Sequence, residues 1–431
     1  KGLQVTGSDD EIYEPAKSRL TKAGILPEQE GWFPEKLDAK PDAVILGMHA
    51  RPDNPELKRA QELNIPIYSF PEFIYEQSKD KQRIVIGGSH GKTSITSIIL
   101  HVLQHLGRKF DYAVGAQLEG FDRMVKLTDD APIIVIEGDE YLSDPIKRVP
   151  KFHLYHHHIA VISGISWDHI NVFPDPDMYR EQFRIFAEMT PKAGTLIYNQ
   201  DDEQVLLAAV PRNPADIAYI GYGVHDHSIR NGKTILHTKK EGDVEIQLFG
   251  EHNLRNINAA KEVCKKIGVK AHDFYEALKT FKGAAKRLEK LGENDHSVIY
   301  RDFAHAPSKV KATTEAVKNQ FPQRELVAVV ELHTFSSLNK NFLPQYAGAL
   351  DKADEAIVFF SPKTLEHKRM EMISEEELKN AFRNQSIKVF TDSAALQETL
   401  MNHNWQNANL LLMSSGTYNG MNLNALKQAI L

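Results

Sequence analysis

The residues with the clearest chemistry in this sequence are a lysine and two hydroxyl residues that follow a pair of spaced glycines. They form the run Gly88-Ser89-His90-Gly91-Lys92-Thr93-Ser94. Glycines let consecutive backbone N–H groups face one anion, so this run predicts a loop that cradles phosphates. Lys92 would reach the outer phosphates of a nucleotide such as ATP, and the hydroxyl of Thr93 or Ser94 would bind Mg²⁺. The spacing is shorter than in the common phosphate loop, which would need a glycine where Ile86 stands.

The residues on either side of this run predict the elements that position it. An apolar stretch at 83–87 precedes it, and Ile95, Ile98 and Ile99 follow at helical spacing. The predicted order is strand, loop and helix, so the partial positive charge of a helix start would add to the phosphate site. A glycine-rich turn with a chance lysine is the alternative.

Two later apolar stretches end in polar residues that suit metal and phosphate binding. The first, at 131–136, runs into Glu137-Gly-Asp139-Glu140, and the second, at 159–163, runs towards Asp168-His169. The carboxyl ends of parallel strands share one edge of a sheet, so both ends should face the phosphate loop. Glu137 is the expected Mg²⁺ ligand, and His169 would bind a second metal ion or a phosphate oxygen. Helix caps or solvated turn acids are the alternative at these positions.

Three other groups of residues invite a ligand interpretation with different strength. Asparagines at 253, 256 and 258 open a predicted helix, where capping explains only one of them. His153 and the run 156–158 cannot chelate one ion from a regular strand, because neighbouring strand residues point to opposite faces. Cys264 is expected to be a small buried residue on a helix.

Composition excludes several classes of protein. The chain has 431 residues, 42% of them hydrophobic and 26% charged, with a net charge of −6 and dispersed basic residues. These values favour a globular protein with small-molecule partners over one that binds nucleic acid. No apolar run approaches the roughly 20 residues of a membrane span, and no signal peptide opens the chain. A single cysteine fits a reducing compartment, and we expect the cytoplasm.

Alternating strands and helices predict an α/β protein of three domains, each a mainly parallel sheet with flanking helices. The expected boundaries are 1–80, 81–288 and 289–431, with the central domain of the phosphate-loop ATPase type and a basic junction at Lys282–Lys290. An edge of strand at Leu3–Asp9, followed by a turn, is expected to present Asp9 at its tip, where Asp9 would either bond a ribose or base or be a solvated turn residue. The pair Asn231-Gly232 predicts a hairpin. A segment at Leu343–Leu350 is predicted to be a helix. The strand and glycine-rich turn that normally open a nucleotide-binding domain are missing, so the first domain is expected to be incomplete at its start.

Taken together, these motifs resemble the Mur ligase family over essentially the whole chain. The matching residues are the phosphate loop, Glu137-Gly-Asp-Glu-Tyr141, Trp167-Asp-His169, His252-Asn-x-x-Asn256, Lys286-Arg287 and Asp302-Phe-Ala-His305-Ala-Pro307. The resemblance implies an ATP-dependent ligase that uses ATP and two Mg²⁺ ions. It would join the carboxylate of UDP-N-acetylmuramate to the amine of an amino acid or peptide through an acyl phosphate, in peptidoglycan synthesis or recycling. The residues alone indicate only an enzyme that uses ATP and Mg²⁺.

The resemblance also implies roles for individual positions. Lys92 would hold the phosphates, Thr93 and Glu137 would serve one Mg²⁺, and His169 would serve a second. Asn256 would contact adenine, while Arg287 and Asp302 would close over the nucleotide from the last domain, with His305 nearby. The first domain would bind the UDP-sugar, with Ser8, Asp9 and His49 as the remaining candidates.

The acceptor is predicted by a finer resemblance. The stretch 179–186 has no lysine of the kind that several family members modify, which resembles the branch acting directly on UDP-N-acetylmuramate. Its two acceptors are L-alanine and the tripeptide L-Ala-γ-D-Glu-meso-diaminopimelate. Three motifs look more like the tripeptide ligase: Val5–Asp9 with Tyr13-x-Pro15, Glu137–Tyr141 with 147–152 and 168–174, and Met413–Gly416. In addition, this chain has Thr334 where the alanine-adding enzyme usually has an arginine. We therefore expect the tripeptide, although 331–341 fits neither acceptor pattern.

A phosphate-loop kinase or ATPase is the rival class of enzyme. It would need neither Asn256 nor the 302–307 motif from outside the ATPase domain. A dinucleotide dehydrogenase is disfavoured because no G-x-G-x-x-G fingerprint occurs.

Overall fold

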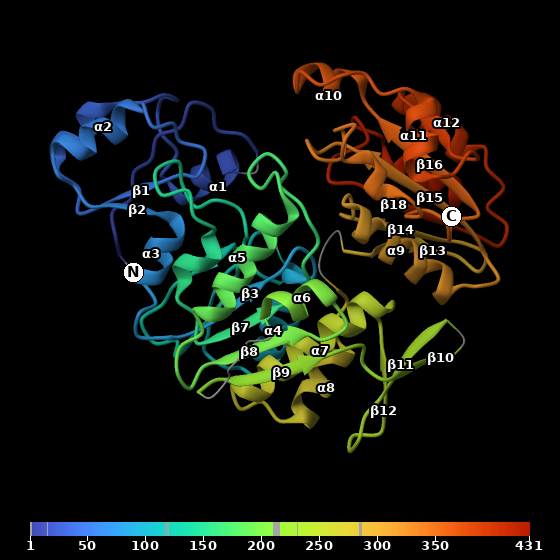
Figure 1. The fold of residues 1–431 in the computed structure, drawn as a ribbon, viewed down its shortest axis with the longest axis horizontal. Helices are drawn as coiled ribbons and strands as arrows, with labels where there is room; N and C mark the ends of the chain where they lie inside the picture. Colours follow the sequence, from blue (N-terminus) through green and yellow to red (C-terminus); the bar gives the residue numbers. More distant parts are fainter. Residues whose placement is uncertain are drawn as a thin grey trace.

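The computed structural model describes residues 2–14, 16–116, 118, 120–209, 216–230, 232–283 and 287–431. Figure 1 shows them as a small N-terminal region in blue, a central sheet in blue-green to green, and a C-terminal sheet in orange to red. The predicted α/β class is confirmed, because both large sheets are mainly parallel and have helices packed against them. The domain boundaries near residues 80 and 288 stay predictions.

The N-terminal region contains a short parallel sheet, three α-helices and one 3₁₀ helix in its described residues. Its elements are α1 (Ala16–Ala23), the 3₁₀ helix η1 (Pro34–Ala39), β1 (Val44–Leu46), α2 (Pro55–Glu62), β2 (Ile67–Ser69) and α3 (Phe70–Glu76). Helix α2 begins after Asn54, because the Asn54 side chain accepts hydrogen bonds from the N–H groups of Glu56 and Leu57.

The strand expected at Leu3–Asp9 is wrong. Asp9 forms only an isolated antiparallel bridge with Gly31, and the rest of this segment is irregular. A strand needs an edge to pair with, and the described N-terminal residues offer only the short β1–β2 pair. Asp9 is therefore not at a strand tip.

The central sheet has the strand order β5-β4-β6-β3-β7-β8-β9 among the described residues. Its strands are β3 (Gln82–Gly87), β4 (Asp111–Ala113), β5 (Val125–Lys126), β6 (Ile133–Glu137), β7 (Ile159–Ile162), β8 (Thr195–Asn199) and β9 (Ala218–Tyr222). Its helical elements are α4 (Lys92–His105), η2 (Lys151–Tyr155), α5 (Pro176–Glu188), α6 (Glu203–Ala209), α7 (Glu251–Lys266) and α8 (Ala271–Lys279). Neighbouring strands are parallel except β4 and β5.

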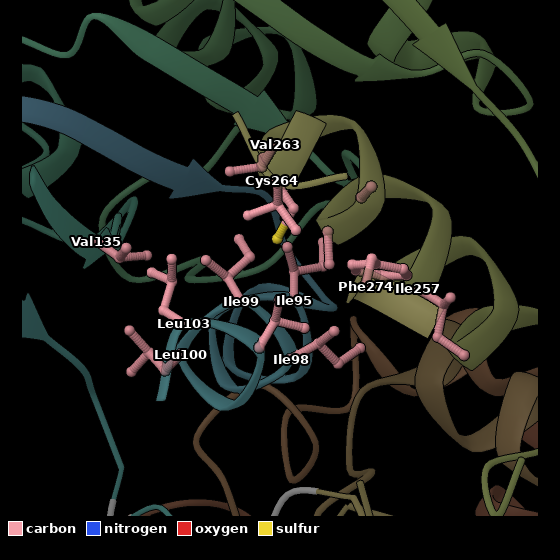
Figure 2. Packing of buried hydrophobic residues seen from close by; sticks show 14 of the residues in the cluster. Ile95, Ile98, Ile99, Leu100, Leu103, Val135, Ile257, Val263, Cys264 and Phe274 are labelled. Atoms are coloured by element: carbon pink, nitrogen blue, oxygen red, sulfur yellow. The ribbon is translucent and has the colours of Figure 1, made fainter. Parts of the chain in front are cut away.

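Helix α4, which begins at the phosphate loop, is fixed by the core of the central region. It packs against α7, α8 and β6, and its Ile95 and Ile99 have no exposed surface. Figure 2 shows Val263 and Cys264 of α7 above these two side chains. Burial of each isoleucine contributes roughly 1.5–3 kcal/mol, so α4 cannot shift without a large loss of stability. Cys264 is a buried core residue, as predicted, and burial raises the pKa of its thiol.

The strands β10 (His227–Arg230), β11 (Lys233–His237) and β12 (Asp243–Ile246) form a separate antiparallel sheet. The predicted hairpin is confirmed by the pairing of Arg230 with Lys233. Asn231 of its turn lies outside the described residues.

The C-terminal sheet has the order β13-β14-β18-β15-β16-β17 in the part of the chain that is described. Its strands are β13 (Glu289–Glu293), β14 (Val298–Asp302), β15 (Glu325–Leu332), β16 (Glu355–Phe360), β17 (Lys388–Phe390) and β18 (Ala408–Met413). Its helical elements are α9 (Pro307–Gln320), η3 (Leu343–Tyr346), α10 (Pro362–His367), α11 (Glu375–Phe382), α12 (Ser393–Met401) and α13 (Leu423–Ile430). Only β13 is antiparallel to its neighbour.

One expectation for this region needs correction. The helix predicted at Leu343–Leu350 is a single 3₁₀ turn, because Gly348 has a positive φ of 74° that ends helical structure. The edge strand β13 begins at the end of the basic stretch Lys282–Lys290 and pairs with β14, while the domain junction itself stays a prediction.

The two large regions meet at the helices α7 and α9, which pack against each other. Figure 1 shows the C-terminal sheet beside the central sheet, with α7 below the gap between them. Of the helices formed by the described residues, none is long and apolar enough to cross a membrane.

Candidate active site

The phosphate loop joins β3 to α4 and depends on two glycines. Gly88 has a φ of 134° and Gly91 a φ of 81°, where side chains are rarely tolerated. A Cβ atom on Gly88 would lie 2.1 Å from the Ser163 Oγ atom and 3.0 Å from its backbone nitrogen. The loop is also tied to the end of β7, because the Ser89 N–H donates to the Gly164 carbonyl at 2.8 Å. The sequence thus places the loop against the neighbouring strand with no room for a side chain.

Gly88→Ala is expected to lower the free energy of unfolding by about 2–4 kcal/mol, because the new methyl group would collide with backbone. Gly107→Ala is the matched control, since Gly107 also has a positive φ but open space around its Cβ position. It should cost only about 1 kcal/mol. Urea unfolding of both variants measures the difference, and equal losses would contradict the close approach at Ser163.

Lys92 is the first residue of α4, and its side chain lies back over the loop. Its Nζ atom donates to the Gly88 carbonyl at 2.5 Å and to Glu140 Oε2 at 2.6 Å. Burial, the largest single effect, would lower the pKa of Lys92, but Glu140, Asp139 and Glu137 together outweigh it, so the pKa is raised. Burial would raise the pKa of Glu140, yet Lys92 and His169 hold it well below its usual value. Both groups are therefore charged at neutral pH.

Thr93, at the start of α4, and Glu137, at the end of β6, are in contact as predicted. The Thr93 hydroxyl donates to Glu137 Oε1 at 2.7 Å, and the Gly115 N–H donates to Glu137 Oε2 at 3.1 Å. A hydroxyl and a carboxylate oxygen beside a phosphate loop are ligands that suit Mg²⁺. These residues fit an ion at this position.

His169 lies on the other side of Glu140. Its Nε2 atom is 3.5 Å from Glu140 Oε1, and ligand atoms of Asp139, Glu140 and His169 all lie within 4.8 Å of one another. Burial acts to lower the pKa of His169, but Glu140 and Asp168 overcome it and raise the pKa. The donor set of one imidazole and two carboxylates fits a second divalent ion.

The remaining predicted nucleotide residues come from α7 and from the C-terminal region. Asn256 is buried on α7, and its Oδ1 atom would lie 2.5 Å from a Cβ on Gly91. Arg287 lies over the Phe303 ring at 4.9 Å, with Nη2 3.5 Å from the Thr93 hydroxyl. Asn256 and Arg287 therefore approach the phosphate loop from two sides.

Asp302 and His305 follow β14 and are turned partly towards their own region. Asp302 accepts hydrogen bonds from the Thr313 hydroxyl at 2.9 Å and the Ala304 N–H at 3.1 Å. Burial raises the pKa of Asp302, although Arg287 opposes this. The His305 Nδ1 atom lies 2.9 Å from the Phe303 carbonyl, and burial lowers the pKa of His305 to about 4. The neutral imidazole is the form expected near pH 7.

Comparison with known proteins identifies the family. Residues 86–264 match the model described as the Mur ligase middle domain, and residues 286–416 match the model described as Mur ligase, glutamate ligase domain. A protein of Lactiplantibacillus plantarum named UDP-N-acetylmuramate–L-alanine ligase is 31% identical over 83% of this chain and 79% of that relative. The chain belongs to the Mur ligase family. Members are ATP-dependent enzymes that form amide bonds, generally with Mg²⁺, and this Mur ligase is such an enzyme.

Two further comparisons bear on this Mur ligase. A protein of Escherichia coli named UDP-N-acetylmuramate–L-alanyl-γ-D-glutamyl-meso-2,6-diaminoheptandioate ligase is 28% identical over 83% of this chain and 79% of that relative. The solved structure of a UDP-N-acetylmuramate–alanine ligase from Thermotoga maritima has a TM-score of 0.68 at 19% identity. It covers 99% of this chain and 92% of that chain, which shows the same overall fold.

The candidates for the UDP-sugar are not brought to the phosphate loop in this Mur ligase. The Ser8 hydroxyl accepts from Lys36 Nζ at 3.2 Å, and Asp9 accepts from the Asp10 N–H at 2.9 Å. His49 lies in the loop after β1. In the described ranges, none of the three has a hydrogen bond or ion pair to residues 88–94. Pro15 and Lys286, which belong to quoted motifs, lie outside the described residues.

Two residues beside the loop were not found from the sequence. The Tyr179 hydroxyl of α5 donates to Glu140 Oε1 at 3.1 Å and shares a 2.8 Å hydrogen bond with Ser89 Oγ. Tyr179 has no exposed surface, so its sequence signal is that of a core aromatic. Glu140 is part of a recognised acidic run, but nothing in the run indicates which acid would pair with Lys92.

The side chains of His153, His157 and His158 do not converge on one ligand position. His153 Nε2 lies 2.8 Å from the Gln182 carbonyl, His157 Nε2 lies 2.9 Å from the Thr190 hydroxyl, and His158 Nδ1 accepts from the Arg83 N–H at 3.1 Å. Each ring has its own partner, which agrees with the argument that strand neighbours cannot chelate one ion.

Proposed function

We propose that this Mur ligase joins the carboxylate of UDP-N-acetylmuramate to the amine of the tripeptide L-Ala-γ-D-Glu-meso-diaminopimelate, with cleavage of ATP to ADP and phosphate. The observation that carries the proposal is the convergence of Lys92, Glu137 and His169 at one edge of the central sheet. Such an edge of a parallel sheet is where ligands bind. The enzyme would act in peptidoglycan synthesis or recycling.

The site residues would divide the work by their chemistry. ATP would supply the phosphoryl group that activates the sugar carboxylate as an acyl phosphate. Lys92 and the N–H groups of the loop would hold the phosphates and oppose their charge. Thr93 and Glu137 would hold one Mg²⁺, and His169 would hold a second. Asn256 would fix adenine, while Arg287, Asp302 and His305 would close on the nucleotide from the C-terminal side.

The three regions would take separate substrates. Residues 1–80 would bind the UDP-sugar, with Ser8, Asp9 and His49 as candidate contacts. Residues 81–288 would bind ATP, and residues 289–431 would bind the acceptor. The packing of α7 against α9 supports this division, because it brings the ATP residues against the acceptor region.

Two acceptors have support. The Escherichia coli relative is named for the tripeptide, and Tyr141, which carries part of that resemblance, packs edge-on against His169 at 5.0 Å between ring centres. The Lactiplantibacillus plantarum relative, at slightly higher identity, is named for L-alanine. L-Alanine is therefore the second candidate.

The test is phosphate release from ATP with UDP-N-acetylmuramate and either acceptor, with the product identified by mass. We expect release and an amide product with the tripeptide and less than about a hundredth of that rate with L-alanine, a difference of roughly 2.7 kcal/mol. Product with L-alanine alone would reverse the acceptor assignment. Absence of product with both would reject UDP-N-acetylmuramate ligation and favour the kinase or ATPase class.

A further inference from the structure

A lysine from the C-terminal region, Lys309, reaches the phosphate loop of the central region. It is the third residue of α9, whose start is tied to the segment after β7 by a 3.2 Å contact between the hydroxyls of Ser308 and Ser166. Ser166 in turn donates its N–H to Ser89 Oγ at 2.9 Å. The first turn of α9 therefore lies against the loop that begins at Gly88.

The Lys309 ammonium has no partner of its own. Among the described residues it has no hydrogen bond and no carboxylate within ion-pair distance. The charges that act on it are, in order of strength, Lys92, which repels it, Asp168, which attracts it, Arg287, which repels it, and Glu140, which attracts it. Burial, together with Lys92, lowers the pKa of Lys309 to about 8. A half-buried ammonium beside two other cations is unfavourable unless an anion joins them.

Two neighbouring features also indicate that an anion binds beside Lys309. A cation in the first turn of a helix faces the positive end of the helix dipole, so the position of Lys309 on α9 is also unfavourable by itself. The Nδ1 atom of His90, in the phosphate loop, is enclosed and has no hydrogen-bond partner among the described residues. Lys309 is the strongest of the charges that act on His90. The buried Nδ1 atom of His90 and the Lys309 ammonium thus both suit a multiply charged anion bound at the loop.

We propose that Lys309 binds the phosphoryl group that is transferred from ATP. The proposal rests on the proposed function, because it assumes that ATP occupies the loop. Lys92 is already paired with Glu140 at 2.6 Å, so Lys309 adds a positive charge beside the loop that no carboxylate of the described residues offsets within ion-pair distance. Charge placed where the phosphoryl oxygens develop negative charge stabilises the transition state.

With Lys309 at this place, phosphoryl transfer also depends on the position of the C-terminal region. Lys309 belongs to α9, so its charge reaches the phosphates only while the start of α9 lies at Ser166. The acceptor region would then complete the phosphoryl site when it is in position to deliver the acceptor. Cleavage of ATP without an acceptor region in place would be slow for the same reason.

The test compares two nucleotides that differ by the γ-phosphate, ADP and the β,γ-methylene analogue of ATP, by calorimetry with Mg²⁺. Lys309→Met is expected to weaken the triphosphate analogue about tenfold and ADP by less than about twofold, and to lower kcat about a hundredfold. Lys309→Arg keeps the positive charge and should recover most of the affinity for the triphosphate analogue and most of kcat. Lys311→Met is the matched control, because Lys311 is exposed on the same helix and points away from Lys309.

Each other outcome overturns the proposal. Equal weakening of both nucleotides, with a lower melting temperature, would make Lys309 a structural residue. If the ratio of the affinities for the triphosphate analogue and ADP is unchanged and the KM for UDP-N-acetylmuramate is raised, Lys309 would instead bind the sugar carboxylate. No effect, or no recovery in Lys309→Arg, would remove it from the site. The nucleotide ratio is measured without sugar or acceptor, so it stands apart from whether wild-type protein makes the proposed amide.

Discussion

Lys92→Met is expected to reduce ligase turnover about a thousandfold, or roughly 4 kcal/mol in activation free energy. The ammonium of Lys92 is the cation that the phosphate loop itself supplies, and the structure holds it at the loop by the Gly88 carbonyl and Glu140. Methionine keeps the length of the side chain and removes the charge. Single-turnover phosphate release measures the loss, and a variant that keeps above about a tenth of wild-type activity would contradict the role of Lys92.

The same substitution removes the closest cation from the buried Glu140 and leaves it His169 at 3.5 Å and the Tyr179 hydroxyl at 3.1 Å, which is expected to lower stability by a few kcal/mol. The double variant Lys92→Met with Glu140→Gln separates the two effects, because it removes both charges together. We expect the double variant to regain the melting temperature and to stay inactive. Lys192→Met is the surface control, since the Lys192 side chain is 89% exposed, and it should keep full activity.

The centre of the site could be predicted because its parts are local in sequence. A strand, a glycine turn and a helix start fix Lys92 and Thr93 within a few residues. The meeting of Glu137 with Thr93 at 2.7 Å follows from one further rule, that the carboxyl ends of parallel strands share an edge. The order of parallel strands in the sheet is therefore sufficient to predict that Glu137 lies beside Thr93.

The partners of these residues could not be predicted, because they depend on which side chains other elements bring to the loop. Tyr179 reaches Glu140 from a helix whose apolar face reads as core. Lys309 reaches the loop from helix α9 of the C-terminal region, and its only unusual feature in the sequence is its place in the first turn of a helix. Contacts of this kind are set by tertiary packing, which a single sequence does not display.

The errors in secondary structure have the same origin. The segment Leu3–Asp9 has strand-like residues but no strand to pair with, so it forms only the bridge at Asp9. In contrast, β13 forms in a charged stretch because the edge of β14 is open to it. Strand formation in both cases is decided by the available neighbour rather than by local propensity.

Glu137→Ala is expected to raise the Mg²⁺ concentration for half-maximal activity at least about tenfold and to lower kcat about a hundredfold. The Glu137 carboxylate lies at the end of β6, where it accepts from the Thr93 hydroxyl and from the Gly115 N–H. Loss of the carboxylate removes a negatively charged oxygen ligand and frees Thr93 from its orientation. Raising Mg²⁺ should restore part of the rate, because the hydroxyl and the nucleotide phosphates would still hold the ion weakly.

A direct metal measurement keeps this prediction independent of turnover. Mn²⁺ titrated into protein with ADP and followed by electron paramagnetic resonance should show one tight ion fewer in Glu137→Ala than in wild type. Asp130→Ala is the matched control, because Asp130 is an exposed carboxylate beyond the opposite end of the same strand, paired with Lys109 at 2.7 Å. Because His169 and Glu140 are untouched, a second ion at His169 should still bind. Identical Mg²⁺ and Mn²⁺ titrations in wild type and Glu137→Ala would remove Glu137 from the metal site and leave it as a hydrogen-bond partner of Thr93 alone.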